Sequence, residues 1–255
     1  MPHPLESIPG IGTPESFVAI KKTLSAFEQL ARDLEQAAPD TIIVISPHAK
    51  MDPYSFIINS ESELRGTFQN FNLDQVYEYD NNIEIADKLA YACTMNEMPC
   101  ILHGSFLDHG ALIPLHHLTK NMKSKPKVLH LAFSLMSYER HYRYGEIIQK
   151  IIDEDESERI AVIASGDLSH NLTRNAPAGF SQESAAFDRT VLRYLGCNDL
   201  ASLMGLEESE SKAARECGIR SIMILLGIVH GKKYKFDLLS YEGPFGVGYL
   251  TARLL

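Results

Sequence analysis

The sequence predicts an α/β fold, with a single domain in which helices flank a central sheet that is largely parallel or mixed. Short apolar runs rich in β-branched residues or leucine alternate with longer segments whose apolar residues recur at helical spacing. The chain has 255 residues, 45% of them hydrophobic, which is enough for one sizeable core. No low-complexity tract and no internal repeat divides it. We therefore expect residues 1–255 to form one domain.

Four apolar runs are typical of strands that are buried on both faces. Each run is short and is followed by a loop-like segment, which favours a strand over a helix. The predicted strands are Thr41–Ser46, Cys100–His103, Val128–Phe133 and Ile160–Ser165. Two further β segments are expected within residues 235–255, on either side of the turn-rich sequence EGPFGVG.

The segments between these runs have the period of amphipathic helices. In Ser16–Ala38 the apolar residues form one stripe, with Pro14 near the start and Pro39 after the end, as expected for helix boundaries. The other predicted helices are Asn82–Met95, Gly145–Asp153, Gln182–Leu195 and Ser209–Gly231. In folds of this kind, ligands bind where the loops that follow the strands converge.

Composition and charge exclude several classes of function. Asp and Glu number 33 against 24 Lys and Arg, giving a formal net charge of −9, which argues against a nucleic-acid-binding protein. No apolar stretch approaches the roughly 20 residues of a membrane span, and the first residues lack the basic and apolar regions of a signal peptide. The four cysteines contain no CxxC pair. We expect a cytoplasmic protein with reduced cysteines.

Histidine is the unusual component, with ten residues in the chain. His48, His109 and His170 each come shortly after a predicted strand, and His3 lies between two prolines that keep its backbone extended. Imidazole binds Fe, Zn, Cu and Ni and transfers protons near neutral pH. These four histidines therefore indicate a metal site with an acid/base neighbour at one edge of the sheet.

A carboxylate is expected beside the metal, because imidazoles alone do not compensate its charge. Glu216 comes just before an apolar helix, Glu242 is its competitor, and Cys217 is a softer third candidate. Spacing favours a helix cap for Glu216 and a turn role for Glu242 as much as it favours metal binding. Two histidines and one carboxylate form the facial triad of non-haem Fe(II) oxygenases.

Six segments together carry a resemblance to a known family: PHP, ISPHA, LDHGALIPL, GDLSHNL, ECGIRSIMILLG and SYEGPFGVGYL. With them the chain resembles the LigB-like family of class III extradiol ring-cleaving dioxygenases over essentially its whole length. The last two segments are closest to the branch found fused to, or encoded beside, AMMECR1-type domains. The wider superfamily includes the Memo proteins.

The resemblance implies roles for particular residues. It implies that His3 and His48 bind the metal, that Glu216 is the third ligand, and that His170 is the catalytic acid/base. Memo-like relatives have a cysteine at the equivalent place, so Cys217 stays an alternative to Glu216. The resemblance also implies that His109 is a second catalytic histidine, which orients bound substrate or dioxygen.

The implied activity is extradiol cleavage of a catecholic ring by O2 with Fe(II) as cofactor. One alternative is a Zn-dependent hydrolase on the same scaffold. The other is a metal-binding protein without ring cleavage, acting with AMMECR1-type and radical-SAM partners. A homodimer is a family-level expectation. The sequence stops soon after SYEGPFGVGYL, and we expect no AMMECR1-type domain within it.

Overall fold

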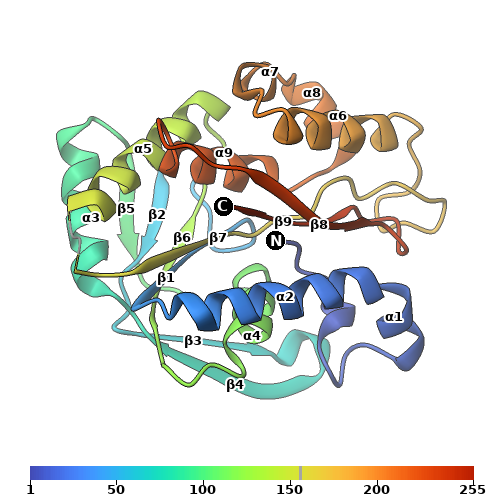
Figure 1. Ribbon diagram of the computed structural model, residues 1–255, viewed down its shortest axis with the longest axis horizontal. Helices are drawn as coiled ribbons and strands as arrows, with labels where there is room; N and C mark the ends of the chain where they lie inside the picture. Colours follow the sequence, from blue (N-terminus) through green and yellow to red (C-terminus); the bar gives the residue numbers. More distant parts are fainter. Residues whose placement is uncertain (155–156) are drawn as a thin grey trace.

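The computed structural model describes residues 1–154 and 157–255, and its centre is a five-stranded sheet (Figure 1). The strand order is β5-β2-β6-β1-β7. β1 pairs in parallel with β6 and β7, whereas β2 is parallel to β5 and antiparallel to β6. The sheet is therefore mixed, and the predicted fold class is confirmed. Its strands are β1 (Thr41–Ser46), β2 (Phe56–Asn59), β5 (Cys100–His103), β6 (Lys127–Ala132) and β7 (Ile160–Ala164).

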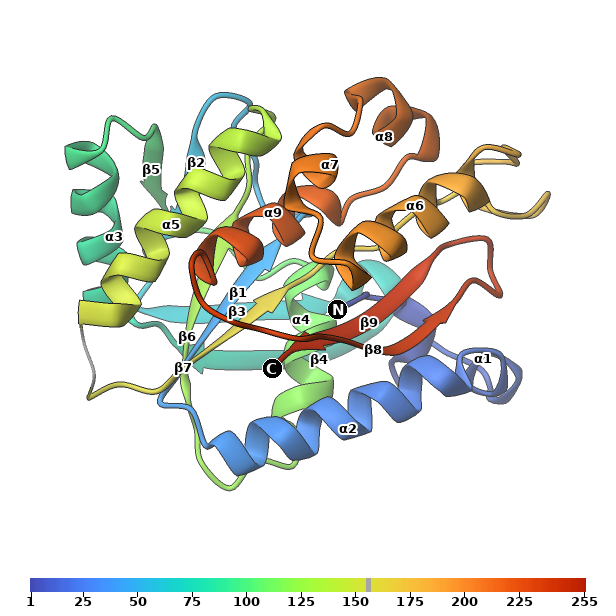
Figure 2. The same cartoon turned by 45° about the horizontal axis from the view of Figure 1, so that its top comes forward.

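Helices cover both faces of this sheet, and two small antiparallel sheets, β3-β4 and β8-β9, pack around it (Figure 2). None of the described helices is both long and apolar enough to cross a membrane. The α-helices are α1 (Pro14–Ala19), α2 (Lys21–Ala37), α3 (Ile83–Met95), α4 (His109–Thr119), α5 (Tyr138–Glu154), α6 (Ser184–Gly196), α7 (Leu200–Met204), α8 (Glu208–Ala214) and α9 (Ile219–Ile228). The remaining elements are 3-10 turns at Leu5–Ser7 and Gln69–Phe71 and strands β3 (Glu63–Phe68), β4 (Leu73–Asp80), β8 (Phe236–Glu242) and β9 (Tyr249–Leu254).

Alternation along the buried strands builds two cores, one on each face of the sheet. In β1, Ile43 and Ile45 belong to the core formed with α3, α5 and α9. The intervening Ile42 and Val44 belong to the core formed with α4 and the β3-β4 hairpin, against which α2 also packs. Successive side chains of a strand point to opposite faces, so a continuously apolar strand supplies both cores.

Local backbone conformation divides two helices that were predicted as continuous. Ile20 separates α1 from α2, and a reciprocal capping box between Thr13 and Ser16 starts α1. The predicted helix Ser209–Gly231 is divided into α8 and α9 because Arg215 adopts a left-handed conformation with φ 54°. These interruptions leave the apolar period unbroken, and periodicity alone therefore did not reveal them.

Other elements also differ from the prediction. α5 begins at Tyr138 rather than Gly145, and strands β2, β3 and β4 were not predicted. α4 was not among the predicted helices, and it contains Pro114, a residue type that usually marks a helix boundary. The capping of α4 by Asp108, whose carboxylate accepts hydrogen bonds from the Gly110 and Ala111 N–H groups, fixes where the helix starts.

Candidate metal centre

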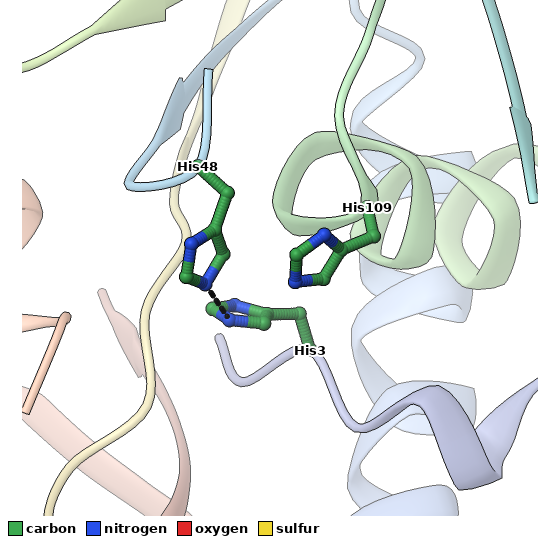
Figure 3. A group of neighbouring side chains, drawn as sticks. All are labelled: His3, His48 and His109. Atoms are coloured by element: carbon green, nitrogen blue, oxygen red, sulfur yellow. Dashed lines mark hydrogen bonds between the residues drawn. The ribbon is translucent and has the colours of Figure 1, made fainter. Parts of the chain in front are cut away.

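Three imidazoles from distant parts of the chain meet at the carboxyl ends of β1 and β7 (Figure 3). His48 follows β1, His109 is the first residue of α4, and His3 enters from the N-terminal segment. The Nε2 atoms of His3 and His48 are 3.0 Å apart. The rings of His48 and His109 stack with centroids 4.3 Å apart. Nitrogen atoms this close share either a proton or a cation.

The N-terminal segment is held against the end of β7, and this places His3. The α-amino group of Met1 donates to the Ala164 carbonyl at 2.7 Å, and the Gly166 N–H donates to the Met1 carbonyl at 3.1 Å. The His3 N–H then donates to Asp167 Oδ1 at 3.0 Å. His3 is only 4% exposed, so its backbone and its ring are both fixed.

Ser165 sets the tautomer of His3. Pro114 has no N–H, so the Gly110 carbonyl of α4 lacks its usual helical donor, and the Ser165 hydroxyl donates to it at 2.6 Å. With its proton committed, Ser165 Oγ accepts from His3 Nδ1–H at 3.1 Å. The Nε2 lone pair of His3 therefore faces the cluster, which is the form that binds a metal.

Asp108 connects the loops that carry His48 and His109. Ser46, at the end of β1, donates to Asp108 Oδ1 at 2.6 Å, and His130 of β6 lies 3.2 Å from Asp108 Oδ2. Hydrogen bonding to His130 and Ser46 keeps the pKa of this buried carboxyl well below its usual range, even though burial alone would raise it. A fixed negative charge thus lies directly behind the histidine cluster.

A second group of metal-binding side chains shares His3. Asp167 Oδ2 lies 3.4 Å from His3 Nε2, and Cys217 Sγ lies 3.8 Å from the same nitrogen. The Asp167 N–H donates to Cys217 Sγ at 3.2 Å. These two residues come together because Gly166 and Gly218 are in backbone contact, where a Cβ on Gly166 would lie 2.2 Å from the Gly218 Cα.

Burial keeps the two imidazoles of this cluster in the neutral form. It lowers the pKa of His3 to about 3, and burial together with the charge of His3 lowers the pKa of His48 to about 4. Both imidazoles are therefore neutral at pH 7, as metal ligands must be. Burial also raises the pKa of the Asp167 carboxyl and of the Cys217 thiol. Neutral imidazoles beside a carboxyl and a thiol fit a divalent transition metal.

The structure does not bring Glu216 into this cluster, contrary to the expectation for the third ligand. Its carboxylate accepts from the Ile219 N–H at 2.7 Å and from the Ser211 hydroxyl, and so it caps the start of α9. Glu242 is also engaged elsewhere, accepting from the N–H and hydroxyl of Thr23 in α2, each at 2.7 Å. Glu216 therefore has the capping role that its spacing allowed, whereas Glu242 is the last residue of strand β8 and does not have the turn role expected as its structural alternative.

His170 lies in the loop that follows β7 and is oriented by its own backbone. Its Nδ1–H donates to the Leu168 carbonyl at 2.9 Å, so Nε2 keeps its lone pair. His170 follows Asp167 by three residues in the same loop, and a positive charge on its ring would lower the pKa of that carboxyl. An imidazole with a free Nε2 lone pair, in the loop that also carries Asp167, has the form of a general base.

Comparison with known proteins identifies the family. The sequence profile described as the catalytic LigB subunit of aromatic ring-opening dioxygenase matches residues 1–252. The chain belongs to the LigB family. Protein CA_C1420 of Clostridium acetobutylicum is 33% identical to it over 265 residues, a match that covers 100% of this chain and 56% of the relative. This LigB-family chain thus spans about half the length of that relative.

A solved structure shares the fold of this LigB-family chain. The crystal structure of uncharacterized protein JW3007 from Escherichia coli K12 matches with a TM-score of 0.67, covering 90% of this chain and 91% of the other. At 18% identity the likeness concerns the fold alone.

Two polar residues of this LigB-family site were not singled out from the sequence. Asp167 and Ser165 lie in and beside the GDLSH segment, directly at the end of a predicted strand, the same position that identified His48 and His170. The available signal was therefore the position at the strand end, applied to serine and aspartate as well as to histidine.

Proposed function

We propose that this chain is a non-haem Fe(II) dioxygenase that opens a catecholic aromatic ring with O2, cleaving beside the two hydroxyls rather than between them. The observation that carries the proposal is the cluster of neutral imidazoles of His3, His48 and His109, with His170 in the loop that follows β7 and carries Asp167. Family membership supports the same class of reaction.

In this proposal His3 and His48 hold the iron together with Asp167, which replaces Glu216 as the carboxylate donor. The Asp167 carboxylate lies 3.4 Å from His3 Nε2 and completes a set of two histidines and one carboxylate. Iron bound there would supply the redox chemistry that allows O2 to react with the ring. Ser165 maintains the ligand tautomer of His3 through Nδ1.

The protein's own groups handle the protons. His170, with Nδ1–H fixed on the Leu168 carbonyl, accepts a phenolic proton at Nε2 and returns it during ring opening. His109 is half-buried beside His48 and orients the substrate or O2 by hydrogen bonding. The Asp108 carboxylate behind them stabilises positive charge that develops on the histidines.

The decisive experiment is aerobic turnover after anaerobic reconstitution of the metal-free protein with Fe(II). A panel of catechols is screened for a yellow ring-opened product together with O2 uptake. We expect both signals for at least one catechol, and both reduced by about 100-fold or more in a matched His170→Ala protein that carries the same amount of iron. Full iron occupancy without turnover on any catechol would contradict the proposal.

Cys217 favours one second candidate, a Zn-dependent hydrolase. A thiol 3.8 Å from His3 Nε2 is a softer donor than carboxylate, and Zn²⁺ accepts Cys, His and carboxylate ligands together. In that case Zn²⁺ would supply an activated water, and His170 would take up a proton from it. Zinc as the metal of the purified protein, with esterase or amidase activity that Cys217→Ser abolishes, would favour this candidate over the dioxygenase.

A further inference from the structure

The edge of the central sheet beyond β7 adjoins an apolar cavity. β7 is the last strand in the sheet order, and within residues 1–154 and 157–255 it pairs with β1 alone. The cavity beside it has a volume of about 570 Å³. β9 borders its far side with Leu250 and Ala252, and both are lining residues. The N terminus lies beside β9 in both ribbon views (Figures 1 and 2).

Met1 already occupies one end of this edge in the manner of a parallel strand. Its N–H group bonds to the Ala164 carbonyl and its carbonyl accepts from the Gly166 N–H. In parallel pairing, the backbone groups of one residue bond to the residues before and after the residue that lies opposite it. Met1 bonds to Ala164 and Gly166, so it lies opposite Ser165. A strand leading into Met1 would continue along β7 in parallel.

The rest of the edge presents backbone groups to the cavity. The Ser165 N–H points to β1, where it donates to the Ile45 carbonyl. Backbone groups of successive strand residues point to opposite sides, so the N–H and C=O groups of Ala164 point away from β1. By the same alternation, the N–H and C=O groups of Val162 and Ile160 face away from β1. The residues of β7 from Ile160 to Ala164 line the cavity. Backbone groups in an apolar environment require hydrogen-bond partners.

Helices cover the cavity from both faces of the sheet. α2 contributes Leu30 and Leu34, and α9 contributes Ile222 and Leu225. An extended strand projects alternate side chains to opposite faces, and this arrangement provides an apolar wall for each set. A five-residue strand spans about 16 Å, the length of β7.

We propose that this cavity, the β7 edge groove, binds one extended apolar strand of a partner polypeptide, parallel to β7 and leading toward Met1. The strand would join the central sheet to the β9 side of the molecule. The Clostridium acetobutylicum relative extends well beyond the region that matches this chain, so additional polypeptide does accompany this domain in a relative.

Two other occupants fit less well. A lipid acyl chain would fill the apolar walls but would leave the N–H and C=O groups of Val162 unpaired. A second copy would bring its own β7 together with the α2 and α9 residues that line this edge, so four helices would have to fit around one edge-to-edge pairing. A single extended strand would both pack its side chains against the apolar lining of the cavity and form hydrogen bonds with the backbone N–H and C=O groups of β7.

The test uses the metal-free chain of residues 1–255, so its outcome is independent of the proposed dioxygenase activity. Seven residues of alternating Thr and Val are fused before Met1 to deliver a strand at high local concentration. The matched control extension carries Pro at the positions that face β7. We expect the Thr/Val extension to raise Tm by about 5 °C relative to the control. The amide hydrogen exchange of Val162 and Ala164 should slow at least tenfold, on the order of the protection that new hydrogen bonds give.

Val162→Pro supplies the second arm. Its N–H faces the groove, so proline there leaves the pairing with β1 intact but blocks an added strand. The increase in Tm and the slower amide exchange that the extension causes should both disappear in this variant. In a separate fluorescence anisotropy measurement, the free Thr/Val peptide should bind the unextended protein but not its Val162→Pro variant. Equal Tm for the two extensions overturns the proposal. So does a dimer that Val162→Pro dissociates, or stabilisation by a fatty acid that Val162→Pro leaves unchanged.

Discussion

At the scale of single residues, His48 and His170 have different predicted tasks. His48 Nε2 lies 3.0 Å from His3 Nε2, whereas His170 lies in the loop after β7 and is oriented by the Leu168 carbonyl. We expect His48→Ala to lose bound metal and His170→Ala to keep it while losing turnover by about 100-fold or more. Metal content by mass spectrometry and ring-opening rate are measured on both proteins. The reverse pattern would contradict the assignment.

The third ligand is a separate residue-scale question that three matched variants answer. We expect Asp167→Asn to weaken metal affinity most, by about 10- to 100-fold, because the carboxylate nearest to His3 is lost. Cys217→Ser should have the smaller effect on iron. Glu216→Gln should keep the metal but lose about 1 kcal/mol of stability, because the cap of α9 is weakened.

Metal titration and urea unfolding of each variant separate these effects. A Glu216→Gln protein that loses metal at unchanged stability would restore Glu216 as the ligand. It would also show that the cap rearranges when metal binds.

At the scale of elements, α4 depends on a bond from outside the helix. Pro114 removes the helical donor to the Gly110 carbonyl, and Ser165 replaces it. Ser165→Ala should cost about 1–3 kcal/mol by leaving that carbonyl unpaired. In a Pro114→Ala background the restored N–H of residue 114 should reduce this cost by about 1 kcal/mol. A double-mutant cycle of urea unfolding measures the coupling, and additive effects would refute it.

The same helix carries a buried neutral histidine. Ser7 donates its proton to the Pro4 carbonyl, so Ser7 Oγ accepts from His117 Nε2–H at 2.9 Å. Burial lowers the pKa of His117 to about 3 from its ordinary value of 6.5. Between these values the unfolded chain binds the proton and the folded chain does not. The contribution of His117 to the free energy of unfolding is therefore constant above about pH 6.5 and falls as the pH decreases below that value.

The expected slope from His117 is about 1.4 kcal/mol per pH unit between about pH 6 and pH 4. Urea unfolding of the unmodified protein and of His117→Gln over this range isolates the contribution, because the other titrating groups are shared. Parallel curves for the two proteins would show that His117 is protonated in the folded state.

At the scale of the whole molecule, two glycines join the loop after β7 to the start of α9. A Cβ on Gly166 would lie 2.2 Å from the Gly218 Cα, whereas a Cβ on Gly196 in α6 meets nothing within 4 Å. Gly166→Ala should lower stability by about 2 kcal/mol or more and weaken metal binding by separating Asp167 from Cys217. Gly196→Ala is the control and should be neutral or slightly stabilising. Equal effects would exclude this explanation of the site.

Residue patterns alone were enough to predict the α/β class and four of the five strands of the central sheet, with strand ends correct to within one residue. They also predicted that His3, His48 and His109 lie close together. These follow from short-range rules: strand and helix periods differ, and the residues that follow parallel strands converge at one edge. Strands β2, β3 and β4 were not predicted: β2 has only four residues, and β3 and β4 pair only with each other, outside the central sheet.

Which acidic or thiol side chains join the histidines depends on tertiary contacts. Glu216, Cys217 and Asp167 all lie near strand or helix ends, and their spacing does not distinguish a cap from a ligand. The Gly166–Gly218 contact brings Asp167 and Cys217 to His3, while the free N–H groups at the start of α9 engage Glu216. The cap of α9 forms between Glu216 and Ile219, which are three residues apart in the sequence. The group of His3, Asp167 and Cys217 instead combines side chains from distant parts of the chain, which come together only in the folded protein.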